Sequence, residues 1–245
     1  MEEAPSPFGL LWISASLLDS LVATRHDAWN ASEDIDAMHL KQMILCGLSI
    51  IICVVAKTVL TCLGRFLVPR SSTAAEVLIL EGTDTIERRM LCQAAQQIGS
   101  GRAPRLLLAL HAIPGRPDVE AAQNTAARRL ADQCGLGCPL QILRTPPTHP
   151  ITLTEASVVL QALAGEDIRS AILMTHGFHA RRSYLVYKQI GTALGISIMP
   201  FGVFVAYTAD NWWCSRLGLY ECGEELAKTA YYYVKGYLRL GSFTH

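Results

Sequence analysis

The chain lacks net charge, and this absence argues against one class of partner. Its 245 residues include 21 Lys and Arg and 21 Asp and Glu, so the formal net charge is zero when histidine is neutral. Proteins that bind nucleic acid usually carry a basic patch, because contacts to phosphates supply most of the affinity. We therefore expect no nucleic-acid partner.

Metal-ligand spacing is also lacking. Cys134 and Cys138 lie close together in sequence, but no second Cys or His pair follows nearby, so we expect no metal site. Of the eight cysteines, Cys46, Cys53 and Cys62 fall in an apolar segment. The odd number that remains favours a reducing compartment over a framework of disulfides.

Apolar residues are abundant, and they include one run long enough to cross a bilayer. Hydrophobic residues make up 51% of the chain, and the mean hydropathy is +0.27. Met43–Leu63 meets the need of a membrane-spanning helix for roughly 20 apolar residues. Its single charge, Lys57, can extend toward the headgroups or face another membrane helix. We predict a single-pass membrane protein with its span in residues 43–68. Basic residues lie on both sides of the span, so its orientation stays open.

The residues before this span predict a second, weaker membrane contact. Phe8–Ala23 is apolar but short for a span, and it lacks the basic start of a signal peptide. An interfacial or partner-packed helix fits it better. The acidic segment His26–His39 then predicts an exposed connector, so residues 1–42 form a helix and a linker. Residues 8–63 together would contact the lipid bilayer and membrane-protein partners.

From Glu76 onward, short apolar runs alternate with amphipathic segments. This alternation predicts an α/β fold over residues 76–245, a doubly wound, mostly parallel sheet of the Rossmann-like kind, preceded by the N-terminal transmembrane helix. The predicted strands are Val77–Leu80, Arg105–Leu110, Leu140–Leu143, Ala171–Met174 and Ser197–Val205. The predicted helices are Ile86–Ile98, Pro117–Cys134, Leu153–Ala164, the segment that follows Gly177 as far as Gly191, and Glu221–Leu238.

Polar side chains gather where the fourth predicted strand meets its helix. Ligands of open α/β sheets bind at the carboxyl edge of the strands, and a helix N-terminus there attracts anions. His179 and Arg182 are three residues apart and share one helix face, with Thr175 at the end of the strand. The alternative is that Arg181 and Arg182 are solvated and His179 is a polar turn residue.

The pattern Thr-x-x-x-His-x-x-Arg, at Thr175, His179 and Arg182, resembles the YdcF/SanA/ElyC-like domain, a bacterial family of poorly defined activity. The succession of strands and helices extends the resemblance over about Glu76–Leu238. Gly82 matches the glycine-rich turn after the family's first strand, and Arg88 or Arg89 matches the arginine that opens the next helix.

The resemblance also covers Thr152 and Glu155, in a Thr-x-x-Glu-Ala motif that opens the helix before the histidine motif. A capping box between these two side chains would explain the motif without any ligand. The chain departs from the family in having only Gly82 after the first strand. It also has His111 where the second strand usually ends in Ser-Gly-Gly, so His111 could fill part of the family's pocket.

The resemblance implies a role in the bacterial envelope, on a lipid-linked or nucleotide-like substrate. We expect a membrane-anchored domain that binds a small anionic, phosphate- or nucleotide-like ligand, with His179 and Glu81 as an acid–base pair. Neither a reaction class nor a cofactor follows from these residues. The alternative is a non-catalytic structural subunit of a large membrane complex, because the family's glycines are eroded. The expected ligand-binding residues are Gly82, Thr83, Asp84, Arg88, Thr152, Glu155, Thr175 and Arg182.

Overall fold

The computed structural model describes residues 33–82 and 86–239, with side chains from Lys41 onward. The chain divides into two compact units, one ending at Val59 and the other beginning at Leu60. The segment Phe8–Ala23 and the site residues Thr83 and Asp84, named from the sequence, lie outside the described residues.

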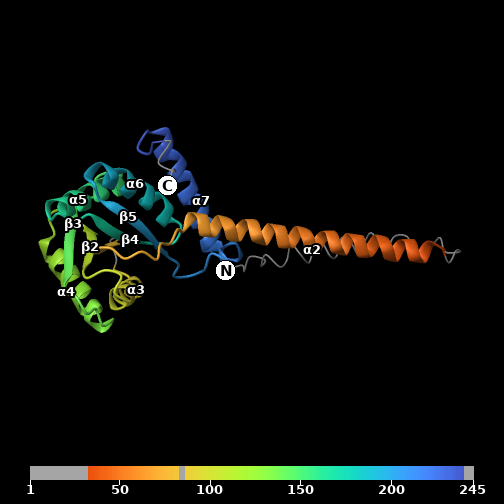
Figure 1. The fold of residues 1–245 in the computed structure, drawn as a ribbon, viewed down its shortest axis with the longest axis horizontal. Coiled ribbons are helices and arrows are strands. Elements are labelled where there is room, and N and C mark those ends of the chain that lie inside the picture. The colour runs from red at the N-terminus through yellow and green to blue at the C-terminus, as the bar shows by residue number, and fades with distance from the viewer. Residues whose placement is uncertain (1–32, 83–85, 240–245) are drawn as a thin grey trace. The chain divides into compact units, whose positions relative to one another are not determined.

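The first unit contains most of α2 (Glu33–Leu67), the long helix in Figure 1. Its stretch Lys41–Leu67 is long and apolar enough to cross a membrane, judged by length and composition. The large apolar side chains between Met43 and Val59 are exposed, as a span surrounded by lipid requires. Residues 33–42, which we expected in an acidic connector, belong to the helix instead, because the helix continues through the acidic residues that precede its apolar part.

The second unit is built on a five-stranded parallel sheet with the strand order β3-β2-β1-β4-β5. Helices cover both faces of the sheet (Figure 1), so the predicted doubly wound α/β fold is confirmed. Every strand and helix predicted for residues 76–245 is present, with bounds shifted by a few residues. The strands are β1 (Val77–Glu81), β2 (Leu106–His111), β3 (Leu140–Thr145), β4 (Ser170–His176) and β5 (Ser197–Val203). The helices are α3 (Arg88–Gly99), α4 (Pro117–Gln133), α5 (Ile151–Gly165), α6 (His179–Leu194), the short 3-10 helix η1 (Trp212–Cys214) and α7 (Arg216–Val234).

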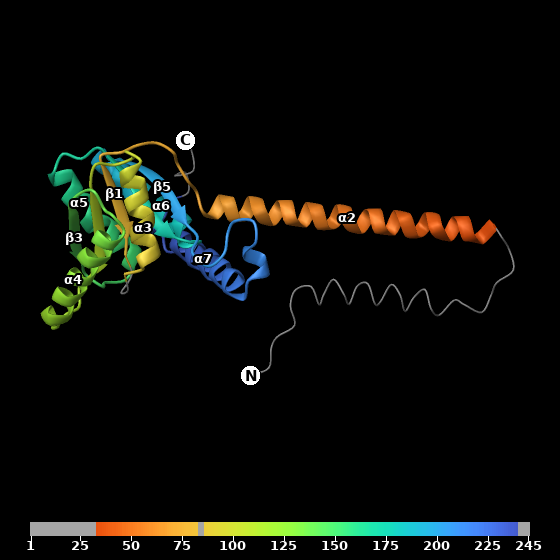
Figure 2. The same cartoon turned by 90° about the horizontal axis from the view of Figure 1, so that it is seen from below.

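Each strand sends alternate side chains to opposite faces, and this alternation makes two cores. On β1, Val77 and Ile79 pack under α5 and α6, whereas Leu78 and Leu80 pack under α3 and α4. Glu81, the next residue, therefore points to the face covered by α5 and α6. Helix α7 adds Tyr232 to that core and packs beside α6 (Figure 2).

A third, aromatic core joins the last residues of α2 to the sheet within the second unit. Leu67 and Val68 are buried there with Phe178, Tyr207 and Trp212. The Trp212 indole donates from Nε1 to the carbonyl oxygen of Leu60 at 3.1 Å. A Cβ added at Gly64 would lie 2.8 Å from the carbonyl oxygen of Ala209 and 2.9 Å from Trp212 Nε1, so only glycine allows this close approach.

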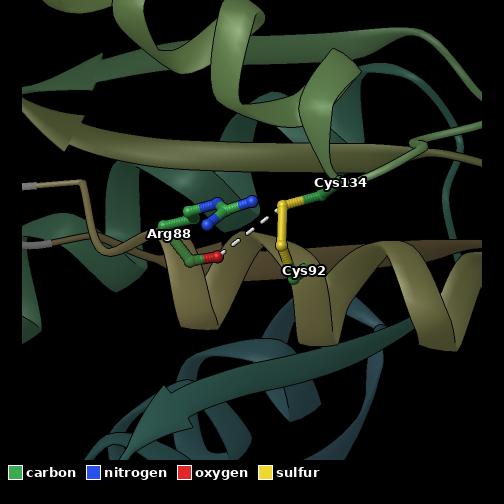
Figure 3. The surroundings of a disulfide bond; sticks show 3 residues. All are labelled: Arg88, Cys92 and Cys134. Atoms are coloured by element: carbon green, nitrogen blue, oxygen red, sulfur yellow. Dashed lines mark hydrogen bonds between the residues drawn. A yellow bond between two sulfur atoms is a disulfide. The ribbon is translucent and has the colours of Figure 1, made fainter.

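A disulfide joins Cys92 on α3 to Cys134, which follows α4 (Figure 3). Its Cα atoms are 4.8 Å apart, and Cys134 Sγ lies 3.8 Å from the carbonyl oxygen of Arg88. The expectation of reduced cysteines is therefore wrong for this pair, and disulfides persist mainly in oxidising compartments. An odd cysteine count cannot reveal which cysteines the packing of α3 against α4 brings together.

Candidate functional site

The candidate site lies at the carboxyl edge of the sheet, between β1 and β4. From this point the strand order runs to β2 and β3 on one side and to β5 on the other. Ligands of doubly wound sheets bind in the crevice outside such a switch point. Glu81 ends β1, and Thr175 follows Met174, the residue of β4 that pairs with Leu80. The two predicted site residues therefore lie beside each other on the face covered by α5 and α6.

Glu81 and His179 form the ion pair expected from the sequence. Glu81 Oε1 is 3.2 Å from His179 Nε2, and it accepts a hydrogen bond of 2.8 Å from the Ser183 hydroxyl. The Glu81 side chain is 5% exposed and that of His179 is 29% exposed. His179 begins α6 and Ser183 lies one turn later, so both face the end of β1. A buried carboxylate thus holds an imidazole that still reaches solvent.

Arg182 is the centre of a second, larger set of contacts, all to other parts of the protein. Its guanidinium donates from Nε and Nη2 to the two carboxylate oxygens of Glu225 on α7, at 2.8 and 3.1 Å. Nη1 donates to the Thr152 hydroxyl at 2.8 Å, and Nη2 lies 2.8 Å from His179 Nδ1. The Arg182 side chain is 6% exposed. Arg182 is therefore not solvated, and its donors are used to bind α5 and α7 to α6.

The contact of Thr152 with Arg182 also removes the capping-box explanation. Helix α5 begins at Ile151 with Pro150 in the N-cap position, and no side chain caps it. Glu155 instead accepts a hydrogen bond from the Tyr187 hydroxyl at 3.2 Å and lies 3.2 Å from His111 Nε2. Local spacing predicted that Thr152 and Glu155 contact each other's backbone. In the structure, Arg182 and Tyr187 on α6 and His111 on β2 contact these side chains instead.

The surroundings of these carboxylates move their pKa values apart. Burial raises the pKa of Glu155 to about 7, the charge of Glu81 acts in the same direction, and the hydrogen bond from His111 opposes the shift. Burial acts to raise the pKa of Glu81 too, but the charge of His179, the hydrogen bonds from His179 and Ser183 and the charge of Arg182 together outweigh it and lower that pKa. Hydrogen bonds from His179 and Arg182 overcome burial and hold the pKa of Glu225 far below its usual range. Near neutral pH, Glu155 is therefore the carboxyl group that can hold a proton.

Two influences act in opposite directions on the His179 ring. Burial favours the neutral ring, but the charge of Glu81 and the hydrogen bonds to Glu225 and Glu81 raise the pKa of His179 to about 9. Arg182 can only donate, so its 2.8 Å contact with Nδ1 requires a ring that accepts there. Two carboxylates flank the ring, Glu81 Oε1 at 3.2 Å from Nε2 and Glu225 Oε2 at 3.5 Å from Nδ1, and they stabilise its protonated form.

These side chains line a cavity of about 470 Å³. Within the described part of the second unit there are four histidines, His111, His149, His176 and His179, and all of them line this cavity. A smaller cavity of about 90 Å³ shares Glu81, Gly82 and His176 with it. The remaining residues around the larger cavity are Pro150, Ile151, Thr152, Glu155, Arg182, Lys228, Tyr231, Tyr232 and Tyr237.

The other predicted site residues lie in different surroundings. Gly82 lines both cavities, but its backbone N–H also donates to the carbonyl oxygen of Ala109 at 2.9 Å, and an added Cβ would collide with that oxygen. The close approach of β2 therefore explains why residue 82 is glycine, without any ligand. Arg88 is exposed at the start of α3 and does not line either cavity. Thr175 is buried, and its hydroxyl has no hydrogen-bond partner among the described residues.

Sequence reasoning missed Ser183, Tyr187 and His176 as members of the site. Ser183 and Tyr187 lie one and two turns after His179 on the same face of α6, so helical spacing alone could have found them. His176 gave no such signal, because it lies on the opposite face of β4 from Thr175 and reaches the cavities only at the edge of the sheet. Within the described residues, no group of three or more His, Cys, Asp or Glu side chains could hold a metal ion.

No protein-family model matches the chain, and no curated protein matches it. Among solved structures, the chain is similar to one described as a universal stress protein in complex with cAMP. That match has 12% sequence identity and a TM-score of 0.33, and it covers 54% of this chain and 98% of the other.

Proposed function

We propose that the second unit is a membrane-anchored α/β domain that binds a small anionic, phosphate- or nucleotide-like ligand at the carboxyl edge of its sheet. The observation that supports this most directly is the gathering of all four described histidines of the unit around one cavity at the switch point. Membership of the YdcF/SanA/ElyC-like family, with Thr175, His179 and Arg182 as its motif, is part of the same proposal. The apolar α2 would provide the anchor.

The charge balance of the site supports an anion near its mouth. Each buried carboxylate has a basic partner: Glu81 contacts His179, Glu155 contacts His111, and Glu225 contacts Arg182. These pairs leave the deep part of the cavity with little net charge. Lys228 and His176 are the basic groups nearer the solvent. The Lys228 side chain is 45% exposed, and its Nζ lies 3.0 Å from Glu224 Oε1 and 3.3 Å from Glu225 Oε1. An anion at the mouth would contact His176 and compete with Glu224 and Glu225 for Lys228, while Arg182 positions His179.

In this proposal the cavity also carries an acid–base pair. His179 reaches the cavity, and Glu81 behind it stabilises the protonated ring, so His179 would donate or accept a proton at the ligand. Glu155, with its pKa of about 7, would be the second group able to exchange a proton near neutral pH. Both groups lie on helices that pack on the same face of the sheet.

Titration calorimetry of the full chain in lipid nanodiscs tests the proposal. The probes are inorganic phosphate, AMP and uncharged adenosine. We expect AMP to bind more tightly than adenosine, and Lys228→Gln to weaken AMP binding about tenfold, the usual effect of losing one charged hydrogen bond. Arg129→Gln, which removes an exposed basic residue on α4, is the matched control and should leave affinity unchanged. Equal affinity for AMP and adenosine, or no saturable binding of any probe, would contradict the proposal.

A second candidate is a non-catalytic structural subunit of a membrane complex. The observation that favours this candidate is the set of hydrogen bonds from Arg182 to Thr152 on α5 and Glu225 on α7. These bonds give the polar cluster a structural role, that of joining three helices, which needs no ligand. Gentle extraction from native membranes, followed by native mass spectrometry, distinguishes the two. Stoichiometric migration within a much larger assembly would favour this candidate, whereas a monomer or homodimer would favour the ligand-binding domain.

A further inference from the structure

Exposed apolar surface is distributed very unevenly over the second unit. Among its described residues, the exposed large hydrophobic side chains belong only to the end of α2 and to α7. Monomeric soluble proteins rarely expose contiguous apolar patches larger than about a few hundred Å², and patches above that size usually mark an interaction surface. The exposed side chains are Phe66, Leu217, Leu219, Tyr220, Leu226, Tyr231 and Val234.

On α7 these side chains form a continuous outer face. Its inner face is packed against the domain and carries Gly218, Cys222, Glu225 and Tyr232, which are all buried. Leu219, Leu226 and Val234 are spaced by seven and eight residues, so they lie on one opposite stripe, with the small exposed residues Gly223, Ala227 and Ala230 between them. A helix that is apolar on both faces is normally covered on both faces.

The start of α7 is held beside the end of the apolar helix α2. Trp212, just before α7, donates to the carbonyl oxygen of Leu60, and Arg65 pairs with Asp210 at 3.1 Å. The span needs roughly 20 apolar residues, so the candidate span that begins at Lys41 has already crossed the hydrocarbon core near these contacts. The segment that leads into α7 is therefore fixed where the span would leave the bilayer.

The composition of the outer face fits a membrane surface. Tyr220 and Tyr231 are exposed on α7, and Trp213 is half-buried just before it. Tyrosine and tryptophan favour the level of the lipid headgroups, because each ring has an apolar body and a polar tip. Leucine and valine beside them can enter the acyl boundary, as in helices that lie in the membrane interface.

We propose that the outer face of α7 lies on the surface of the lipid bilayer, next to the point where α2 leaves it. This inference rests on the membrane anchor of the proposed function, but not on the ligand. The α/β domain then contacts the membrane through α7 as well as through α2. Helix α7 would face lipid on its outer side, while the same helix contributes Glu225 and Lys228 to the polar cluster.

Quenching of tryptophan fluorescence by brominated lipids tests the proposal on the full chain in phosphatidylcholine vesicles. The background carries Trp12→Phe, Trp29→Phe and Trp213→Phe, and Leu226→Trp adds a reporter to the outer face. Ala126→Trp, at an exposed position on α4 over the other face of the sheet, is the matched control. We expect lipid brominated near the headgroup to reduce the emission of the Leu226→Trp reporter and to leave that of Ala126→Trp unchanged.

An alkaline carbonate wash of the same vesicles separates the possible failures. If the washed protein stays in the membrane and both reporters are equally unquenched, the α7 proposal is overturned while the anchor stands. A Leu226→Trp emission that is blue-shifted but unquenched would overturn it too, and would identify a protein surface as the cover. Release of the protein by the wash would overturn both the anchor and this proposal.

Discussion

Replacing Arg182 by methionine is the most direct test of how the polar cluster holds the domain together. The Arg182 side chain is 6% exposed and that of Glu225 is 11% exposed, and two hydrogen bonds join them. Removing one partner of a buried ion pair costs about 3–5 kcal/mol, because the other charge stays buried without compensation. Here the lower end applies, since Lys228 Nζ remains 3.3 Å from Glu225 Oε1.

We therefore expect Arg182→Met to lower the free energy of unfolding by about 3 kcal/mol. With urea m-values of about 1–3 kcal/mol/M, the midpoint of unfolding falls by about 1–3 M. The assay is urea unfolding of the full chain in mild detergent, followed by tryptophan emission. Arg129→Met, at an exposed position on α4, is the control and should shift the midpoint only slightly.

A double variant decides whether the lost pair is the cause. Arg182→Met combined with Glu225→Met removes both charges, and replacing a buried pair by apolar side chains is often neutral. The double variant should therefore be more stable than Arg182→Met alone. If Arg182→Met behaves like the control, or if the double variant loses as much as the two single variants together, the reasoning about a buried pair is wrong.

Two further predictions follow from the disulfide and from His179. The disulfide between Cys92 and Cys134 closes a loop with a sequence separation of 42, so Cys134→Ser should lower the free energy of unfolding by about 4 kcal/mol on the chain-entropy argument. Urea unfolding of the wild type with and without reductant checks this. If the reductant leaves the free energy of unfolding of the wild type unchanged, the prediction is contradicted. The raised pKa of His179 stabilises the fold below about pH 6.5, and this contribution disappears as the pH rises through about 9. A pH series should show this loss of stability in the wild type and a smaller one in His179→Asn, and identical profiles would refute it.

The elements of the fold could be predicted because their signals are local. The apolar run of β4, followed by Thr175 and the helical spacing of α6, was recognisable without any knowledge of the partner strands. The end of α6 shows the limit of such signals. The predicted helical segment extends only to Gly191, but Gly191 lies inside the helix, where an added Cβ would approach the carbonyl oxygen of Ile196 to 2.8 Å. The helix ends at Gly195, which has φ of +71°, a left-handed conformation that glycine adopts without strain.

The order of the strands could not be predicted by the same means. Parallel neighbours are joined through long crossovers, so the pairing of β1 with β4 depends on residues far apart in sequence. That pairing is what creates the switch point and brings Glu81 beside Thr175. The sequence predicted a parallel sheet with a site at the carboxyl edge of its strands. The structure shows that β1 and β4 are the two strands that flank this site.

The structure shows contacts of Arg182 within the protein that the sequence-based expectation did not include. An arginine at a helix start beside a histidine indicated an anion-binding residue, but specificity for a ligand requires donors that are still available. The contacts of Arg182 with Glu225, Thr152 and His179 use its nitrogens within the protein. In the structure Arg182 contacts His179 and joins three helices, and it also lines the cavity. We expect an anion in the cavity to contact the more exposed basic groups, among them Lys228, for which it would compete with Glu224 and Glu225. The comparison of Lys228→Gln with Arg129→Gln tests this expectation.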